Sequence, residues 1–259
     1  MSLNLWTGGV NGLFLWATEI KKAYLWTIEV FSSAPSNWLL NNLVSYYEFE
    51  NNVLDSHWAF DWTDFWTSDV AWKILRGRNF DWVNDYINFW TQNYADTFST
   101  SFWFKTTDWT TDNYMLSKYN TWTSSRDWAV IMWDFTWWAW TIWFYVLSNG
   151  VGAIDRAYTT NTFNDWVWHL VECVQYWDWV TRVDIYVDWV LQTVTRVGSA
   201  QSTVHNSTAR VLVWNRDWAS VFYSWEIDEI SIYEQANTQQ NATDRYNSWA
   251  WLPYGDYTN

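Results

Sequence analysis

The sequence predicts an all-β protein, an antiparallel β-sandwich preceded by a short β-hairpin extension. From Leu43 onward, alternating or continuous apolar runs recur at roughly ten-residue spacing with turn-forming residues between them, as in sandwiches. This region shows no sustained helical periodicity, and its nearest approach, Gln239–Asn247, predicts one short helix that closes the domain. A length of 259 residues fits one sandwich of about 200 residues with a small extension.

The first 34 residues carry a short repeat and form the predicted extension. The segment Phe14–Ile20 recurs ten residues later as Tyr24–Val30, and each copy reads as strand, turn and strand. Two such hairpins form either a plain β-meander or an attachment segment, because they are too small to bury a core alone. Small and turn-forming residues at Ser32–Asn37 then predict a linker over residues 35–42.

The predicted sandwich covers residues 43–247 and is followed by a C-terminal tail, residues 248–259. Its apolar runs are rich in β-branched and aromatic residues, which favours strands. The expected strands are Val44–Phe49, Tyr86–Phe89, Ser99–Thr106, Tyr114–Lys118, Ala129–Met132, Thr141–Leu147, Trp168–Tyr176, Arg182–Asp188, Arg210–Val213 and Ile227–Tyr233.

Tryptophan is strongly over-represented, with 29 Trp against 8 Gly. Many of these Trp residues follow Asp, where glycine would complete the Asp-Gly dipeptide of hairpin turns. A left-handed backbone costs an L-residue about 1–2 kcal/mol, so about ten such turns would consume the roughly 5–15 kcal/mol by which a domain is stable. We therefore interpret most of these positions as glycine, in a gene whose stop-type codon is read as glycine under an alternative genetic code. The Trp residues after Asp are Trp62, Trp82, Trp109, Trp128, Trp166, Trp179, Trp189 and Trp218.

A smaller set of Trp residues is expected to be authentic. Trp103 and Trp168 lie inside strand-like runs, where aromatic residues belong. The alternative interpretation is a genuine Trp-rich lectin whose indoles stack on sugars, but stacking sites need only a few indoles.

The charge balance argues against a nucleic-acid partner. The net charge is −14 and the 14 Lys and Arg residues are scattered, without the basic stripe that neutralises phosphates. Cys173 is the single cysteine, so no disulfide forms within one chain, and its apolar run predicts a buried side chain. The segment Met1–Leu5 does not resemble a signal peptide, and the apolar stretch Trp137–Leu147 is too short to span a bilayer.

With Trp read as Gly at turns, five parts of the chain carry recognisable motifs. They are an opening strand with an Asp-Ser turn, an "FDG…DYI" hairpin, an "F-T-x-S-x-W-x-K" strand, a "DGxWHxV…YVDG" pair and a "GxIDEVxIY" terminal strand, at Leu43–Ser56, Asn79–Ile87, Phe98–Lys105, Asn164–Val171 with Ile185–Val190, and Trp225–Tyr233. Together these segments resemble the laminin-G-like, concanavalin A-type jelly-roll family. The likeness covers residues 43–247 and implies a concanavalin A-like jelly roll that binds glycans, proteins or other subunits. The N-terminal repeat also resembles leaders of phage tail and surface proteins.

The same resemblance implies one metal ligand, Asp228. In many such jelly rolls an Asp on the last strand, with backbone carbonyls near the first strand, holds a structural Ca²⁺, an ion that prefers oxygen ligands. The alternative is an Asp satisfied by backbone amides. Four further Asp residues are expected to form turns: Asp55, Asp81, Asp85 and Asp188.

The sequence identifies no catalytic residue. The run Glu226–Glu229 resembles the start of a glucanase strand, but Ile230 and Ser231 stand where a second Glu is needed, and retaining hydrolysis requires two carboxylates about 5–5.5 Å apart. His57, His169 and His205 are dispersed, and His169 is expected to be structural. Ligand-binding residues are not identified.

These observations predict a non-enzymatic carbohydrate- or surface-binding module from a phage tail or virion, assembled in the cytoplasm. Its expected partners are a cell-surface glycan or other virion subunits, with homo-oligomerisation as a possibility. A bacterial cell-surface adhesin is the alternative, and a polysaccharide-degrading enzyme is the third.

Overall fold

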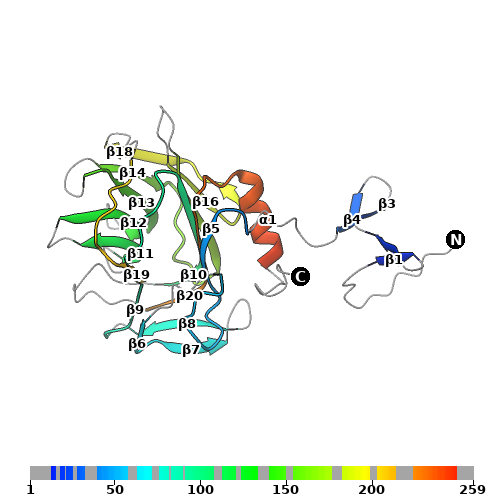
Figure 1. Ribbon diagram of the computed structural model, residues 1–259, viewed down its shortest axis with the longest axis horizontal. Helices are drawn as coiled ribbons and strands as arrows, with labels where there is room; N and C mark the ends of the chain where they lie inside the picture. The colour runs from blue at the N-terminus through cyan, green and yellow to red at the C-terminus, as the bar shows by residue number, and fades with distance from the viewer. Residues whose placement is uncertain are drawn as a thin grey trace.

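The computed structural model describes residues 13–15, 18–20, 22–25, 28–32, 40–57, 63–71, 76–81, 83–89, 91–107, 113–120, 124–133, 140–149, 154–176, 183–198, 203–213 and 224–249. Two antiparallel eight-stranded sheets form a sandwich (Figure 1). This confirms the predicted all-β sandwich.

Sheet I has the strand order β17-β16-β15-β10-β20-β8-β7, and β5 also pairs with β20. The long strand β20 is its centre, because it pairs with β10, β8 and β5. The bounds are β5 Leu43–Tyr47, β7 Ser68–Ala71, β8 Arg76–Asp81, β10 Phe98–Lys105, β15 His169–Gln175, β16 Val183–Val187, β17 Val190–Leu191 and β20 Ser224–Tyr233.

Sheet II has the order β18-β14-β13-β12-β11-β19-β9-β6. After Thr141, strand β13 is a continuous apolar run, and every residue of β13 is buried. The bounds are β6 Thr63–Phe65, β9 Tyr86–Asn88, β11 Asn113–Asn120, β12 Ser125–Trp133, β13 Thr141–Leu147, β14 Ile154–Thr159, β18 Val194–Gly198 and β19 Val211–Val213.

The core lies between the two sheets. Side chains alternate across a strand, so Val130 and Met132 of β12 point into the core, whereas Ala129 and Ile131 belong to a second apolar cluster on the other face. Cys173 of β15 is in the core, as predicted, and burial raises the pKa of its thiol well above the ordinary value.

The helix α1, Gln239–Trp249, covers the outer face of sheet I. Its start is capped reciprocally, because Thr238 Oγ1 accepts the Asn241 amide at 3.2 Å and Asn241 Oδ1 accepts the Thr238 amide at 2.8 Å. Further along, Arg245 and Glu172 form a fully buried ion pair at 2.6 Å. The predicted closing helix is thus present and anchored to the sheet.

Two separate hairpins precede the sandwich in the chain. Strand β1 (Leu13–Leu15) pairs with β2 (Thr18–Ile20), and β3 (Lys22–Leu25) pairs with β4 (Ile28–Ser32). They match the predicted strand, turn and strand repeat, although residues 16, 17, 26 and 27 at the turns lie outside the described residues. The domain boundaries at 34, 42 and 247 remain predictions.

Each strand expected in the sandwich is present, and all but Thr141–Leu147 have shifted ends. The structure adds β6, β7, β8, β14, β17 and β18, whose short or polar sequences gave no clear signal. One expectation is wrong: Asn79–Ile87 is not a hairpin. Strand β8 pairs with β7 and β20 in sheet I, whereas β9 pairs with β6 and β19 in sheet II, so the segment crosses between the sheets.

The described Trp residues divide by backbone conformation. Trp66, Trp166 and Trp189 have φ of 67°, 63° and 63°, and their exposed fractions are 66%, 48% and 40%. The last two follow Asp, as the glycine interpretation requires. The expectation of a turn at Trp128 is wrong. Trp128 lies within β12 and is fully buried, so this Asp-Trp pair forms no turn. Trp62, Trp82, Trp109, Trp179 and Trp218 lie outside the described residues.

Buried Trp residues occupy strands instead. Trp103 is 1% exposed in β10, as expected for an authentic aromatic residue. Trp168 is half-buried and packs against the apolar cluster on the outer face of sheet I, beside the start of β15.

Candidate functional site

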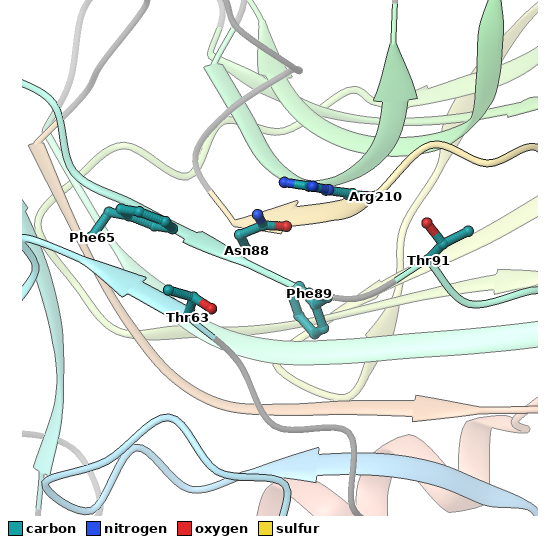
Figure 2. Close-up of a pocket in the computed structure, with 6 residues that line it drawn as sticks. All are labelled: Thr63, Phe65, Asn88, Phe89, Thr91 and Arg210. Carbon is teal, nitrogen blue, oxygen red and sulfur yellow. The ribbon is translucent and has the colours of Figure 1, made fainter.

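A pocket of about 370 Å³ lies at the β6 edge of sheet II. This volume is at the lower end of the range for small-molecule sites. Figure 2 shows the Arg210 side chain extended above Asn88, with Phe65 to one side. The lining residues are Thr63, Phe65, Asn88, Phe89, Thr91 and Arg210.

Strand pairing explains how distant residues meet in this pocket. Thr63 of β6 lies directly opposite Asn88 of β9, and Phe65 lies opposite Tyr86. Directly paired residues share one face of a sheet, so these side chains lie on one face. Ile87, between Tyr86 and Asn88, is fully buried in the core. Thr63, Phe65 and Asn88 therefore line the pocket from the outer face of sheet II, whereas Phe89, which also lines it, belongs to the core.

Phe65 forms one side of the pocket, and its ring is supported by Tyr86. The rings of Phe65 and Tyr86 are stacked, with centroids 4.3 Å apart and planes at 11°. At the base of the pocket, Phe89 contacts Tyr47 of the core edge-on at 5.2 Å. These contacts fix the apolar wall before any ligand arrives.

Two hydrogen bonds hold the chain on both sides of Arg210. Thr91 Oγ1 donates to the Thr208 carbonyl at 3.1 Å, and the Phe89 amide donates to the Val211 carbonyl at 2.8 Å. Asn88 Oδ1 is buried and has no hydrogen-bond partner among the described residues. A buried amide oxygen without a partner is costly unless a ligand or water donates to it, so Asn88 is a candidate ligand contact.

The nearest acidic side chain on β6 is neutralised. Asp64 lies between Thr63 and Phe65 on the opposite face of the strand, and its Oδ2 is 3.3 Å from Arg78 Nη1. Arg78 also binds Asp69 at 2.8 Å. This bridge joins the two sheets beneath the pocket.

The structure places the predicted metal ligand, Asp228, in β20 at a β-bulge opposite Trp103, where it is fully buried. The described residues contain no group of three His, Cys, Asp or Glu side chains suited to a metal ion. A calcium site at Asp228 would therefore depend on backbone carbonyls or on residues outside the described ranges, and it stays a prediction.

The resemblance to a glucanase strand does not produce an open carboxylate pair. Glu226 Oε2 is 2.8 Å from Lys105 Nζ, and Asp228 and Glu229 are 0% and 1% exposed. Burial raises the pKa of Glu229 well above its ordinary value, against the hydrogen bond donated by Tyr46. These carboxyl groups belong to the packing of sheet I.

His169 is structural, as predicted. Its Nδ1 lies 2.7 Å from Asp188 and its Nε2 3.1 Å from Asp165. Burial alone lowers the pKa of His169, but the hydrogen bond and charge of Asp188, aided by Asp165, raise it above the ordinary value. Asp188 Oδ1 also accepts the Leu170 amide at 3.0 Å. The contacts of Asp188 with His169 and Leu170 therefore join the end of β16 to the start of β15.

The other predicted turn residues also accept backbone amides. Asp55 accepts from Tyr46 and His57, Asp81 accepts from Val83, and Asp85 accepts from Asp81, all at 2.9–3.0 Å. His57 and His205 are far apart in the chain and join no common cluster, since His205 binds Asp127 at 3.0 Å. None of these residues lines the pocket.

Sequence reasoning missed every pocket residue. Asn88 and Arg210 fall inside predicted strands, but nothing in the sequence pairs the strand of Asn88 with Thr63. Phe65 and Trp66 give the only local signal, an aromatic pair at a turn between short strands.

Comparisons with known proteins concern the fold. No family model and no curated protein matches the sequence. Among solved structures, domain 4 of AbnA, a GH43 extracellular arabinanase from Geobacillus stearothermophilus, in complex with arabinotriose, aligns with a TM-score of 0.61 at 17% identity, over 78% of this chain and 97% of that one.

Two toxin domains align comparably. The binding domain of Paraclostridial Mosquitocidal Protein 1 gives a TM-score of 0.62 at 12% identity, over 80% of this chain and 52% of that one. The botulinum neurotoxin serotype D ligand binding domain, in complex with N-acetylneuraminic acid, gives 0.61 at 11% identity, over 82% and 52%. The chain thus spans about half the length of these toxin domains. At such identities the likeness shows one thing, that this chain has the β-sandwich fold found in these domains.

Proposed function

We propose that this chain is a non-enzymatic carbohydrate-binding module and that the pocket of Phe65, Asn88 and Arg210 is its binding site. One observation carries the proposal: a preformed pocket combines an aromatic wall with a buried, unpartnered amide oxygen. A sugar presents an apolar C–H face and a rim of hydroxyls. The ring face suits the aromatic wall, and a hydroxyl donates to Asn88.

The comparisons support this choice of ligand class. Domain 4 of AbnA was solved with arabinotriose and the botulinum domain with N-acetylneuraminic acid. We carry over only the class, a sugar, because the identities are low. The finer assignment to the laminin-G-like, concanavalin A-type family belongs to the same proposal and rests on the segments of residues 43–247.

The setting we propose is a phage tail or virion surface, where the module binds a glycan of the host envelope. The support is the hairpin repeat of residues 13–32 and its resemblance to phage leaders. On a particle, many weak sites act together through avidity. A bacterial surface adhesin remains the second candidate, and the genes adjoining this one distinguish the two.

The absence of catalysis is supported by the burial of Asp228 and Glu229 and by the Lys105 contact of Glu226. A structural Ca²⁺ at Asp228 is proposed as the module's cofactor, on the resemblance alone.

A glycan array with the full-length chain tests the proposal. Asn88→Ala should weaken binding to the best array ligand about fivefold, the effect of one hydrogen bond of about 1 kcal/mol. Thr195→Ala, an exposed change on β18 of the same sheet, is the matched control and should leave binding unchanged.

Two results would contradict the proposal. Equal binding by the Asn88→Ala variant and the parent would show that the glycan binds outside this pocket. Absence of binding to any glycan would indicate a purely structural subunit. Release of reducing ends from a polysaccharide would show an enzyme instead.

A further inference from the structure

We infer that the pocket selects sugars bearing a carboxylate, with Arg210 as the residue that recognises the acid; this inference rests on the proposed carbohydrate-binding function. The first observation is the state of Arg210. It is exposed, lines the pocket and has no acidic partner among the described residues. Five of the other described Lys and Arg side chains are paired with a carboxylate: Arg78, Lys105, Lys118, Arg196 and Arg245.

In a chain with a large excess of acidic residues, a cation without an acidic partner is unexpected. Acidic residues outnumber basic ones 28 to 14, so carboxylate partners are abundant. The one acidic residue of β6, Asp64, is committed to Arg78 on the opposite face of the strand. Arg210 therefore faces the pocket with its charge uncompensated by the strands that build it.

The backbone around Arg210 is held in place. The backbone is fixed on both sides of Arg210 by the bonds from Thr91 to Thr208 and from Phe89 to Val211. A planar guanidinium binds a carboxylate through two parallel hydrogen bonds, which gives geometric selectivity as well as energy. Because the backbone is already fixed, only the side chain of Arg210 has to be ordered when the ligand binds.

The remaining lining groups specify the rest of the ligand. Asn88 Oδ1 is a buried acceptor, which suits a hydroxyl donor. Phe65 provides an apolar wall for a ring face. One anionic group, at least one hydroxyl and a ring with an apolar face together describe a uronic or sialic acid.

Long-range repulsion does not prevent this binding. The net charge of −14 repels anions, but at 0.15 M salt charges more than about 8 Å away are largely screened. The local Arg210 charge therefore decides whether an acidic sugar is accepted.

The test uses the full-length chain on an array that presents uronic and sialic acid glycans, each beside its methyl ester. The free acids should bind and their esters should bind roughly tenfold or more weakly, as expected for a charge-assisted pair. Arg210→Met should abolish this difference, because it removes the charge and keeps an unbranched side chain. Arg76→Met, which removes an exposed cation of β8 outside the pocket, should preserve the difference.

The outcomes separate this inference from the proposed function. Equal binding of acids and esters, with Arg210→Met unchanged, would overturn the carboxylate inference and leave a neutral-sugar module. Loss of selectivity in Arg76→Met as well would show nonspecific attraction to cations and would also overturn it. No binding to any glycan would overturn the proposed function itself.

Discussion

Replacing Trp66 with glycine should stabilise the protein, although it deletes a large side chain. Trp66 has φ of 67° and is 66% exposed at the turn between β6 and β7. The left-handed conformation costs an L-residue about 1–2 kcal/mol. Glycine loses about 0.5–1 kcal/mol more chain entropy on folding, so the net gain is about 0.5–1 kcal/mol. Trp66 touches Phe65 at a centroid distance of 5.8 Å, a contact that offsets little.

The same change at two other sites should be close to neutral. The Trp166 ring lies 4.2 Å from Lys105 Nζ, a contact of about 0.5–1 kcal/mol at an exposed site. Trp189 meets Tyr246 edge-on at 4.2 Å, a contact of about 0.5–1.5 kcal/mol. Each lost contact cancels most of the backbone gain.

Urea unfolding followed by far-UV circular dichroism measures these differences without depending on tryptophan fluorescence. Trp66→Ala is the matched control, because it removes the ring but keeps Cβ, and it should be less stable than Trp66→Gly by about 1 kcal/mol. Trp103→Ala, in the buried strand β10, should cost about 3–5 kcal/mol. Equal stability of the Gly and Ala variants at position 66 would refute the reasoning. The gene should carry the stop-type codon at Trp66, Trp166 and Trp189 and the standard Trp codon at Trp103.

Further predictions concern the helix, pH, calcium and the N-terminal segment. Arg245→Met should lower the free energy of unfolding by about 3–5 kcal/mol, because it leaves Glu172 buried without its partner, and adding Glu172→Gln should recover part of the loss in urea titrations. Burial, reinforced by neighbouring carboxylates, raises the pKa of Asp85 from 3.8 to about 6. The contribution of the protonated Asp85 carboxyl to folding stability is therefore complete below pH 4 and is lost as pH rises through 6. Asp85→Asn should raise the melting temperature at pH 7 and not at pH 4. An equal change in melting temperature at both pH values would contradict this sign. Millimolar Ca²⁺ should raise the melting temperature of the parent and not of Asp228→Asn, and an unchanged parent would leave Asp228 with a packing role alone. Deleting residues 1–34 should abolish incorporation into a particle and preserve glycan binding, whereas loss of binding would place the hairpins in the site.

The fold was predictable because alternation and turn chemistry are local. The strand Thr141–Leu147 was expected with the bounds it has, and the helix beginning at Gln239 was found. Trp128 shows the limit of dipeptide reasoning. Asp127, the residue before it, is fully buried and pairs with Lys118 at 2.7 Å inside the sheet, so Asp-Trp here is part of a strand and not a turn.

The candidate site was not predictable because its residues meet only through strand pairing. Asn88 and Thr63 are neighbours because β6 pairs with β9 in one register, and a slip of one residue would place Asn88 in the core. Arg210 joins them because β19 pairs with β9 on the other side. The significance of Arg210 also depends on an absence, the lack of an acidic partner among the described residues, which only coordinates reveal.

Nuclear magnetic resonance mapping of the bound glycan tests the central claim most directly. The best array ligand is titrated into the ¹⁵N-labelled full-length chain while the side-chain amide of Asn88 and the Nε–H of Arg210 are followed. We predict that these two signals shift with the same Kd, together with the backbone amide of Phe65. Shifts confined to residues around Trp166 and Trp189, which do not line the pocket, would contradict the account.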